Sequence, residues 1–157
     1  MSEVGSLGRS ADILLSEDNP DDVNLNRLAF QQVDIAHQLH FARDGQEAMV
    51  FLRREGKFAS APRPDLILLD LNMPSKDGRT VLKEIKQDAS LQRIPVIILT
   101  TSDSATDRIL AYRHNANAYL VKPMDIDELY EMVQSIAHFW LKQVRHAPHA
   151  SGGASAK

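Results

Sequence analysis

Apolar and polar positions along this chain follow two alternating periods, one typical of strands and one typical of helices. Five short apolar runs bounded by polar or turn-forming residues predict strands, at 13–15, 38–42, 65–70, 96–99 and 118–121. Apolar residues spaced three and four positions apart predict five helices between and after them, beginning near 19, 44, 78, 104 and 125. Strands that alternate with helices in this way are typical of an α/β fold with a parallel sheet.

Two of the predicted strands indicate that the sheet is covered on both faces. The runs at 65–70 and 96–99 are apolar at successive positions, so both faces of each strand are apolar. A strand tolerates that pattern when helices cover it on both sides. The predicted division into strands and helices is supported at three helix starts, where Asn19, Asp44 and Asp125 stand at the positions expected for N-cap residues.

The length of 157 residues is that of one ordinary domain. We expect a flexible N-terminus over 1–10, a folded domain over 11–144 and a disordered tail over 145–157, because the Gly, Ser and Ala of the tail cannot bury enough apolar surface to offset ordering. The stretch 56–64 contains Gly, Ser and two prolines and predicts an exposed loop. We expect no output module after the last helix, so that the signal passes through protein contacts.

Composition and charge exclude several classes of function. The chain has no cysteine, which excludes disulfides, zinc–thiolate sites and a catalytic thiol. The net charge is −3, and residues 145–157 carry one Arg, one Lys and no acid, which leaves −5 on the rest. That balance disfavours binding to nucleic acid. No apolar run approaches the ~20 residues of a membrane span, and the first residues lack the apolar core of a signal peptide. We expect a cytoplasmic protein without nucleic-acid or membrane contacts.

Polar side chains stand at the ends of four predicted strands. They are Glu17 with Asp18, then Asp70, Thr100 and Lys122. The carboxyl ends of parallel strands meet at one edge of a sheet, where open α/β sheets place their reactive groups. Carboxylates are ligands that magnesium prefers, and a Lys and a hydroxyl can bind phosphoryl oxygens. The pattern predicts a magnesium-assisted site that accepts a phosphoryl group.

Over residues 11 to about 144 the chain resembles the receiver domain of two-component response regulators. The segments that carry the resemblance are 14–19, 70–74 with 77–78, 96–101 and 118–123. The resemblance implies a flavodoxin-like fold, with a doubly wound, parallel, five-stranded sheet in the strand order 2-1-3-4-5 and helices on both faces. It also implies a protein that is no enzyme beyond its own phosphorylation and dephosphorylation.

The resemblance further implies how the site works. Asp70 would be the phospho-acceptor, and the phosphoryl donor would be a histidine kinase. Mg²⁺, or Mn²⁺ or Ca²⁺ in its place, would be held by Asp18, Asp70, the backbone carbonyl of Asn72, and Glu17 through water. The family often has Asp where this chain has Glu17, and one extra methylene moves the carboxylate by ~1.5 Å. That difference is why water-mediated contact is expected for Glu17.

Three further features are implied on the other side of the site. Thr100 and Lys122 would hold the phosphoryl group, and the peptide bond between Lys122 and Pro123 would be cis. Tyr119 would be the switch residue, turning into the space that Thr100 leaves when it is drawn toward the phosphoryl group. Ser16 stands at a strand position that is usually apolar in the family, where we expect a buried hydroxyl bonded to the backbone.

The loop at 56–64 and the ending Phe139-Trp140-Leu141 resemble more narrowly the small response regulators paired with cyanobacterial phytochromes. That resemblance implies a light-sensing kinase of the phytochrome type and a place in a phosphorelay with a downstream protein or phosphotransfer partner. Phe139, Trp140 and Leu141 also crowd the end of the last helix, beyond what a five-stranded sheet needs. We expect an exposed apolar patch there and a homodimer through the fourth helix, fifth strand and fifth helix.

Two alternatives remain open on the sequence. A haloacid-dehalogenase-like phosphatase would use Asp70 as its nucleophile, but that class has Asp-x-Asp where this chain has Asn72 in the second place. A nucleotide- or flavin-binding module would need a glycine-rich phosphate loop after the first strand, where this chain has Glu17 and Asp18.

Overall fold

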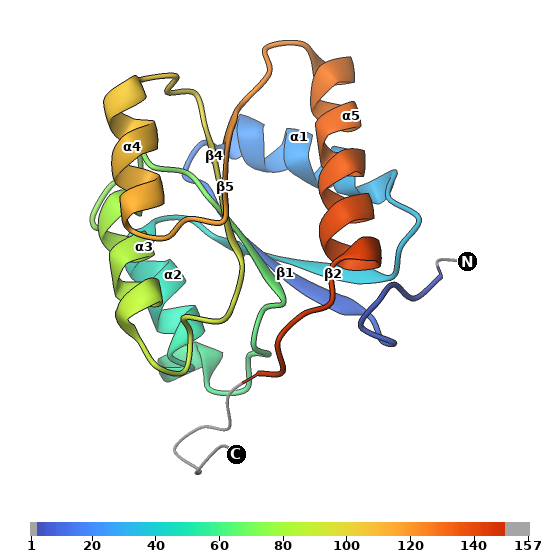
Figure 1. The fold of residues 1–157 in the computed structure, drawn as a ribbon, viewed down its shortest axis with the longest axis horizontal. Helices are drawn as coiled ribbons and strands as arrows, with labels where there is room; N and C mark the ends of the chain where they lie inside the picture. The colour runs from blue at the N-terminus through green and yellow to red at the C-terminus, as the bar shows by residue number, and fades with distance from the viewer. Residues whose placement is uncertain (1–2, 150–157) are drawn as a thin grey trace.

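The computed structural model describes residues 3–149, which form a five-stranded sheet with helices on both faces (Figure 1). The strands are β1 (Ala11–Ser16), β2 (His37–Ala42), β3 (Leu66–Leu69), β4 (Val96–Thr100) and β5 (Ala118–Val121). They lie in the order β2-β1-β3-β4-β5, and each neighbouring pair is parallel. The predicted α/β fold and its flavodoxin-like strand order are confirmed.

Five α-helices connect and follow the strands. They are α1 (Pro20–Gln31), α2 (Gly45–Leu52), α3 (Gly78–Gln87), α4 (Ala105–Arg113) and α5 (Ile126–Ala137), and α5 continues into a π-helical turn, η2 (His138–Gln143). One core cluster joins α1 and α5 to one face of the sheet, and a second joins α2, α3 and α4 to the other. Figure 1 shows these two layers on either side of the sheet. All four residues of β3 are buried, because each face of this central strand has a helical layer over it.

The predicted N-caps explain where three of the helices begin. The side chain of Asn19 accepts hydrogen bonds from the N–H groups of Asp21 and Asp22, and Asp44 accepts one from Glu47. Asp125 caps α5 by accepting from Asp127. These bonds satisfy backbone donors that have no partner within the helix. Because β1 ends at Ser16 and α1 begins at Pro20, only three residues connect them, and two of these are the acids of the site.

The loop at 56–64 is less exposed than we expected. It contains a short 3₁₀ turn, η1 (Gly56–Phe58), and Phe58 and Ala61 pack against the core. The rings of Phe58 and Phe51 lie 5.2 Å apart, measured between centroids. The prediction of an exposed loop was therefore wrong for these residues, because isolated apolar side chains in an aperiodic stretch carry no signal of the surface that they will meet.

The first described residues lie beside the end of α5. Ser6 donates to the carbonyl oxygens of Leu141, from its N–H at 2.8 Å, and of Val144, from its hydroxyl at 2.7 Å. Arg9 donates twice to the buried Asp65, at 2.9 and 2.8 Å. Residues 1–2 and 150–157 lie outside the described residues, so the expected flexibility of 1–10 and disorder of 145–157 stay predictions. In the part described, no helix combines the length and apolarity needed to cross a bilayer.

Candidate functional site

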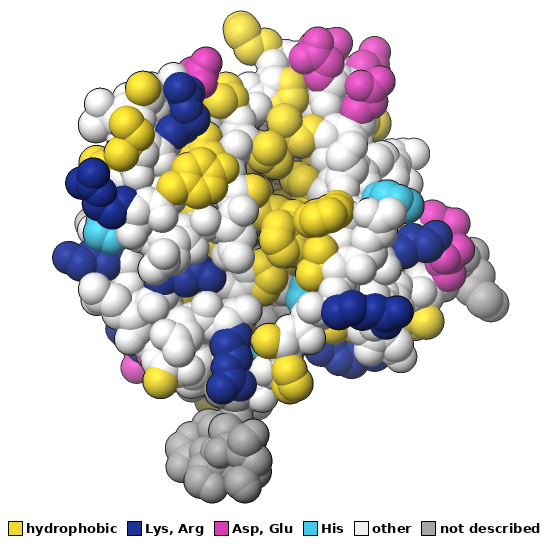
Figure 2. Space-filling view, viewed as in Figure 1, with side chains coloured by type: hydrophobic (Ala, Val, Ile, Leu, Met, Phe, Trp, Pro, Cys, Tyr) yellow, Lys and Arg dark blue, Asp and Glu magenta, His cyan; other side chains and the backbone are white. Residues whose placement is uncertain are grey.

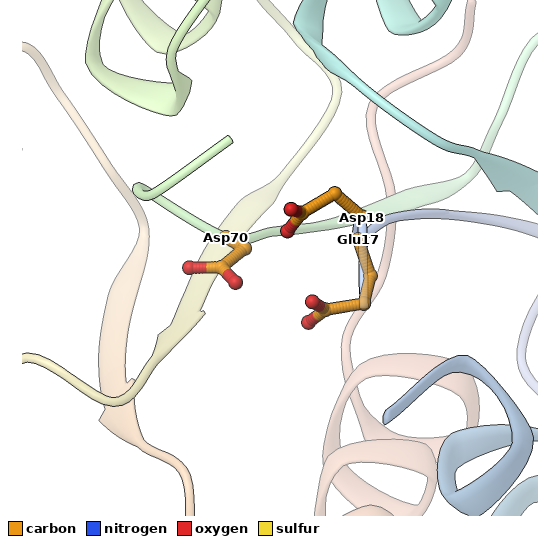
Figure 3. A group of neighbouring side chains, drawn as sticks. All are labelled: Glu17, Asp18 and Asp70. Atoms are coloured by element: carbon orange, nitrogen blue, oxygen red, sulfur yellow. The ribbon is translucent and has the colours of Figure 1, made fainter. Parts of the chain in front are cut away.

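The acids at the ends of β1 and β3 meet at the carboxyl edge of the sheet. Ser16 and Leu69 are paired in register, so Glu17 and Asp70 follow two central strands at the same level. Backbone bonds extend this pairing, since the N–H of Asp70 donates to the carbonyl oxygen of Ser16 at 3.2 Å. Carboxylate oxygens of Glu17, Asp18 and Asp70 lie within 4.8 Å of one another. Figure 3 shows the three carboxylates around one space.

Lys122 reaches this cluster from the end of β5. Its Nζ donates to Asp70 Oδ2 at 3.1 Å, to Asp22 Oδ2 at 3.3 Å and to Glu17 Oε1. Burial opposes its charge, but the hydrogen bond to Glu17 and the charges of Asp70 and Glu17 outweigh that cost and raise the pKa of Lys122 above its usual value. Burial also opposes the charge of Glu17, and it raises the pKa of this carboxyl even though the contact with Lys122 lowers it. Lys122 is therefore a fixed ammonium between the acids.

The three acids suit a hard divalent cation. Magnesium binds oxygen at about 2.0–2.1 Å, which puts neighbouring ligands about 3 Å apart and opposite ligands about 4.2 Å apart in an octahedron. Oxygens of Glu17, Asp18 and Asp70 all lie within 4.8 Å of one another, which is close to that spacing. Glu17 and Asp70 are buried while Asp18 is exposed, so one side of the cluster is open to solvent for waters or a phosphoryl oxygen.

The segment after β3 is held against Asp70 by two features. A β-carbon on Gly78 would lie 2.1 Å from the carbonyl oxygen of Asp70, so this close approach requires glycine. The N–H of Asn72 donates to Asp70 Oδ1 at 3.1 Å, which places the Asn72 peptide beside the Asp70 carboxylate. The close approach of Gly78 positions the start of α3, and the hydrogen bond positions the residue whose carbonyl we expect to be a metal ligand.

Ser16 has a partner that we did not predict. Its hydroxyl donates to Met73 Sδ at 2.9 Å, and the residue is fully buried. The expected bond from this hydroxyl to the backbone was therefore wrong. Both backbone groups of a strand residue are already used by neighbouring strands, so a buried hydroxyl there turns to whatever acceptor the opposite loop supplies.

Thr100 and Tyr119 lie on the neighbouring strands β4 and β5. Thr100 is buried, and its Oγ1 accepts from the N–H of Ser102 at 3.5 Å, the long limit of a hydrogen bond. The hydroxyl of Tyr119 donates to the carbonyl oxygen of Ser102 at 2.9 Å. The Tyr119 side chain thus points at the loop that follows Thr100, and its rotation upon phosphorylation stays a prediction.

Two acidic residues of this region were missed from the sequence. Asp107 accepts from the Ser102 hydroxyl at 2.6 Å and from Arg79 at 2.9 Å, so it ties the β4–α4 loop to α3. These hydrogen bonds lower the pKa of Asp107. Asp22, in the first turn of α1, contacts Lys122 at 3.3 Å. No sequence signal marks either contact, because each joins segments that only the fold brings together.

The expected cis bond before Pro123 was wrong: among the described residues every peptide bond is trans. The intrinsic preference between the isomers is only ~0.5–1 kcal/mol for a bond to proline, so the surrounding contacts decide it. Here the N–H of Lys122 donates to the carbonyl oxygen of Thr100 at 2.8 Å, so the pairing of β4 with β5 extends to Lys122.

The apolar patch predicted at the end of α5 is present only in part. Phe139 is 50% exposed and Trp140 is half-buried, but Leu141 is 1% exposed and belongs to the core. Leu141 therefore cannot contact a partner, because η2 turns it back toward the sheet. An apolar groove of about 370 Å³ lies beside Phe139 and Trp140, against β5. Figure 2 shows apolar side chains gathered between α4 and α5, over β5.

Comparisons with known proteins agree with this geometry. The profile of the response regulator receiver domain matches residues 13–134. Response regulator Rcp1 of Synechocystis sp. is 48% identical over 132 residues, which cover 84% of this chain and 90% of that protein. The phosphatase alternative finds no support in these matches.

Two solved structures are similar in fold and sequence. The crystal structure of the Mn²⁺-bound form of Rcp1 superposes with a TM-score of 0.83 at 46% identity, covering 88% of this chain and 99% of that one. The crystal structure of the phosphorylated cyanobacterial phytochrome response regulator RcpA superposes with a TM-score of 0.86 at 44% identity, covering 89% and 100%.

Proposed function

Because this chain belongs to the response regulator receiver domain family, we propose that it accepts a phosphoryl group from a histidine kinase onto Asp70. The observation that carries the proposal is the contact of Asp70 with Lys122 at 3.1 Å, inside a cluster with Glu17 and Asp18. An acceptor carboxylate, an ammonium beside it and acids that suit a divalent cation are the parts that phosphoryl transfer requires. The chain would act on no substrate other than its own Asp70, which it phosphorylates and dephosphorylates.

The transfer forms one bond and breaks another. An oxygen of Asp70 attacks the phosphorus of a phosphohistidine, and the P–N bond breaks as the imidazole nitrogen keeps the electron pair and takes a proton from solvent. Lys122 neutralises charge on one phosphoryl oxygen, and the Thr100 hydroxyl donates to another. When bound, a divalent cation supplies further charge neutralisation at the phosphoryl group. We assign it to Asp18, Asp70, the carbonyl of Asn72, and Glu17 through water.

Phosphorylation changes the charge next to the switch residues. The acyl phosphate adds about one negative charge and new acceptor oxygens at Asp70. Thr100 would be drawn toward the phosphoryl group. Because Ser102 follows Thr100 on the same loop, this movement would change the hydrogen bond from the Tyr119 hydroxyl to the Ser102 carbonyl oxygen. The face formed by α4, β5 and α5 would therefore report the state of Asp70 to a downstream protein or phosphotransfer partner.

The donor we propose is a light-sensing kinase of the phytochrome type, on the strength of the similarity to RcpA and Rcp1. Such a kinase makes its phosphohistidine from ATP, so the reaction belongs in the cytoplasm. With Mg²⁺ present, label from a phosphorylated kinase of this type should pass to the chain within minutes, and EDTA should stop the transfer. An unrelated histidine kinase serves as the control. Equal transfer from both kinases would contradict the assignment of the donor.

We also propose a homodimer through α4, β5 and α5. Ile109 and Tyr112 are exposed on α4, and Phe139 is exposed at the other side of the groove beside β5. The flanking charges are complementary, since α4 carries Arg108 and Arg113 while α5 carries three acids, Asp127, Glu128 and Glu131. A two-fold axis through this face would place the bases of one copy beside the acids of the other.

Replacing Phe139 tests this dimer. In sedimentation at micromolar concentration the unaltered chain should be dimeric, and Phe139→Ala should weaken the dimer by about tenfold, the usual cost of removing an aromatic anchor. Leu28→Ala is the control, because Leu28 is exposed on α1, which is not one of the three elements of this face. A monomer in both the resting and the phosphorylated state would exclude the dimer, and an equal effect of Leu28→Ala would exclude Phe139 as its contact.

A further inference from the structure

Lys122 contacts three carboxylates, and only two of them belong to the acidic cluster. Glu17 and Asp70 are members of that cluster, in which oxygens lie within 4.8 Å of one another. The third contact is to Asp22 Oδ2, at 3.3 Å, from the first turn of α1. From this geometry we infer that Asp22 is a positioning residue that holds the Lys122 ammonium in the resting state and releases it to the phosphoryl group. The inference rests on the proposed function.

The first step of the argument is the count of hydrogen-bond donors on Lys122. An ammonium has three N–H donors, and the structure directs one each to Glu17, Asp22 and Asp70. The side chain of Lys122 is 10% exposed, so water cannot easily take the place of a missing partner. An oxygen of an incoming phosphoryl group can therefore bind Lys122 only by displacing one of these three carboxylates.

Asp22 is the partner that is displaced at least cost. Its contact with Lys122 is longer than that of Asp70, and its side chain is 34% exposed, against 2% for Glu17 and 9% for Asp70. A carboxylate that is already partly in water regains hydration when its partner leaves, whereas a buried carboxylate would be left without compensation. While the phosphoryl group is still on its donor and Asp70 is still a carboxylate, exchange of Asp22 for a phosphoryl oxygen thus keeps the two buried charges, Glu17 and Asp70, paired.

The consequence is a competition between Asp22 and the phosphoryl group for one ammonium. Removing the charge of Asp22 weakens the resting arrangement and leaves the phosphorylated one unchanged. Phosphorylation should then be faster, because Lys122 is free to bind the incoming phosphoryl oxygen. A partly exposed ion pair of this kind corresponds to a change of about three- to fivefold in the rate of phosphorylation.

Asp21 provides a matched control for the charge. It lies beside Asp22 in the first turn of α1 and is exposed, and among the described contacts its carboxylate has none with Lys122. Asp21→Asn removes the same charge from the same helix end, so it reproduces any general effect on an anionic donor or on the helix. The difference between Asp22→Asn and Asp21→Asn then isolates the contact with Lys122.

The experiment measures the rate of phosphorylation by phosphoramidate, with Mg²⁺ present. Asp22→Asn should be phosphorylated about three- to fivefold faster than Asp21→Asn, with Mg²⁺ affinity the same in both. In a Lys122→Ala background the two variants should become indistinguishable, which a merely structural effect of Asp22 would not produce.

Each failure has a separate meaning. Equal rates for Asp22→Asn and Asp21→Asn, with normal labelling of the unaltered chain, would overturn the role of Asp22 and leave the proposed function standing. A difference that persists without Lys122 would also overturn it, because Asp22 would then act by another route. No labelling of the unaltered chain would overturn both.

Discussion

Asp70→Asn is expected to eliminate phosphoryl uptake from a histidine kinase and from small phosphodonors alike. An amide has the shape of the carboxylate but is not a nucleophile toward phosphorus, so the acceptor is lost while the packing is kept. The fold should survive, because an Asn oxygen can still accept from the N–H of Asn72 or from Lys122, which retains its bonds to Glu17 and Asp22. Intact-mass measurement should show no phosphorylated species.

The control for this variant is Asp65→Asn. Asp65 is also a buried aspartate next to β3, but it stands at the opposite end of the strand and pairs with Arg9. Asp65→Asn should cost some stability and still accept a phosphoryl group at the rate of the unaltered chain. Label on Asp70→Asn at that same rate would identify a different acceptor and end the proposed function.

Lys122→Ala should change two properties in opposite directions. The ammonium competes with a divalent cation for Glu17 and Asp70, so its removal should tighten Mg²⁺ binding by about tenfold, a fraction of the ~4 kcal/mol between unit charges 4 Å apart near a protein surface. Transfer to Asp70 should nevertheless slow by about a hundredfold, because the charge on the phosphoryl oxygen is no longer neutralised. Titration calorimetry and phosphoramidate labelling measure the two effects.

Lys83→Ala controls for the loss of one positive charge. Lys83 is exposed on α3, so its removal should change neither Mg²⁺ affinity nor labelling appreciably. If Lys122→Ala bound Mg²⁺ more weakly than the unaltered chain, the ammonium would be supporting the metal site and not competing with it. Unchanged labelling would show that Lys122 does not contact the phosphoryl group.

Much of the fold can be predicted from local patterns in this sequence. The apolar runs of β3 and β4 predicted strands with two buried faces, and Asn19, Asp44 and Asp125 cap helices where their side chains indicated. Periodicity and capping depend on neighbours within a few residues, so they can be read without knowing the fold. The order of strands came from resemblance to a family, since no local pattern specifies which strands are neighbours.

The central acids of the site could also be predicted. Glu17, Asp18 and Asp70 directly follow β1 and β3, and parallel strands bring their carboxyl ends to one edge whatever the details of packing. The topology therefore determines that these three side chains are close. Their separate contacts are not determined in this way, and the partner of the Ser16 hydroxyl, Met73, shows how such a contact escapes prediction.

Only the tertiary structure decided the contacts between segments that are distant along the chain. Asp22 and Lys122 are 100 positions apart, and their contact depends on how α1 lies beside the end of β5. The direction of Tyr119 and the burial of Leu141 depend likewise on the loop after β4 and on the turn of η2. Each results from many weak packing contacts summed over the whole domain, so no short stretch of sequence contains it. The order of residues in the sequence determines that Glu17, Asp18 and Asp70 meet at the edge of the sheet. The contact of Asp22 with Lys122 is determined only by the packing of the helices.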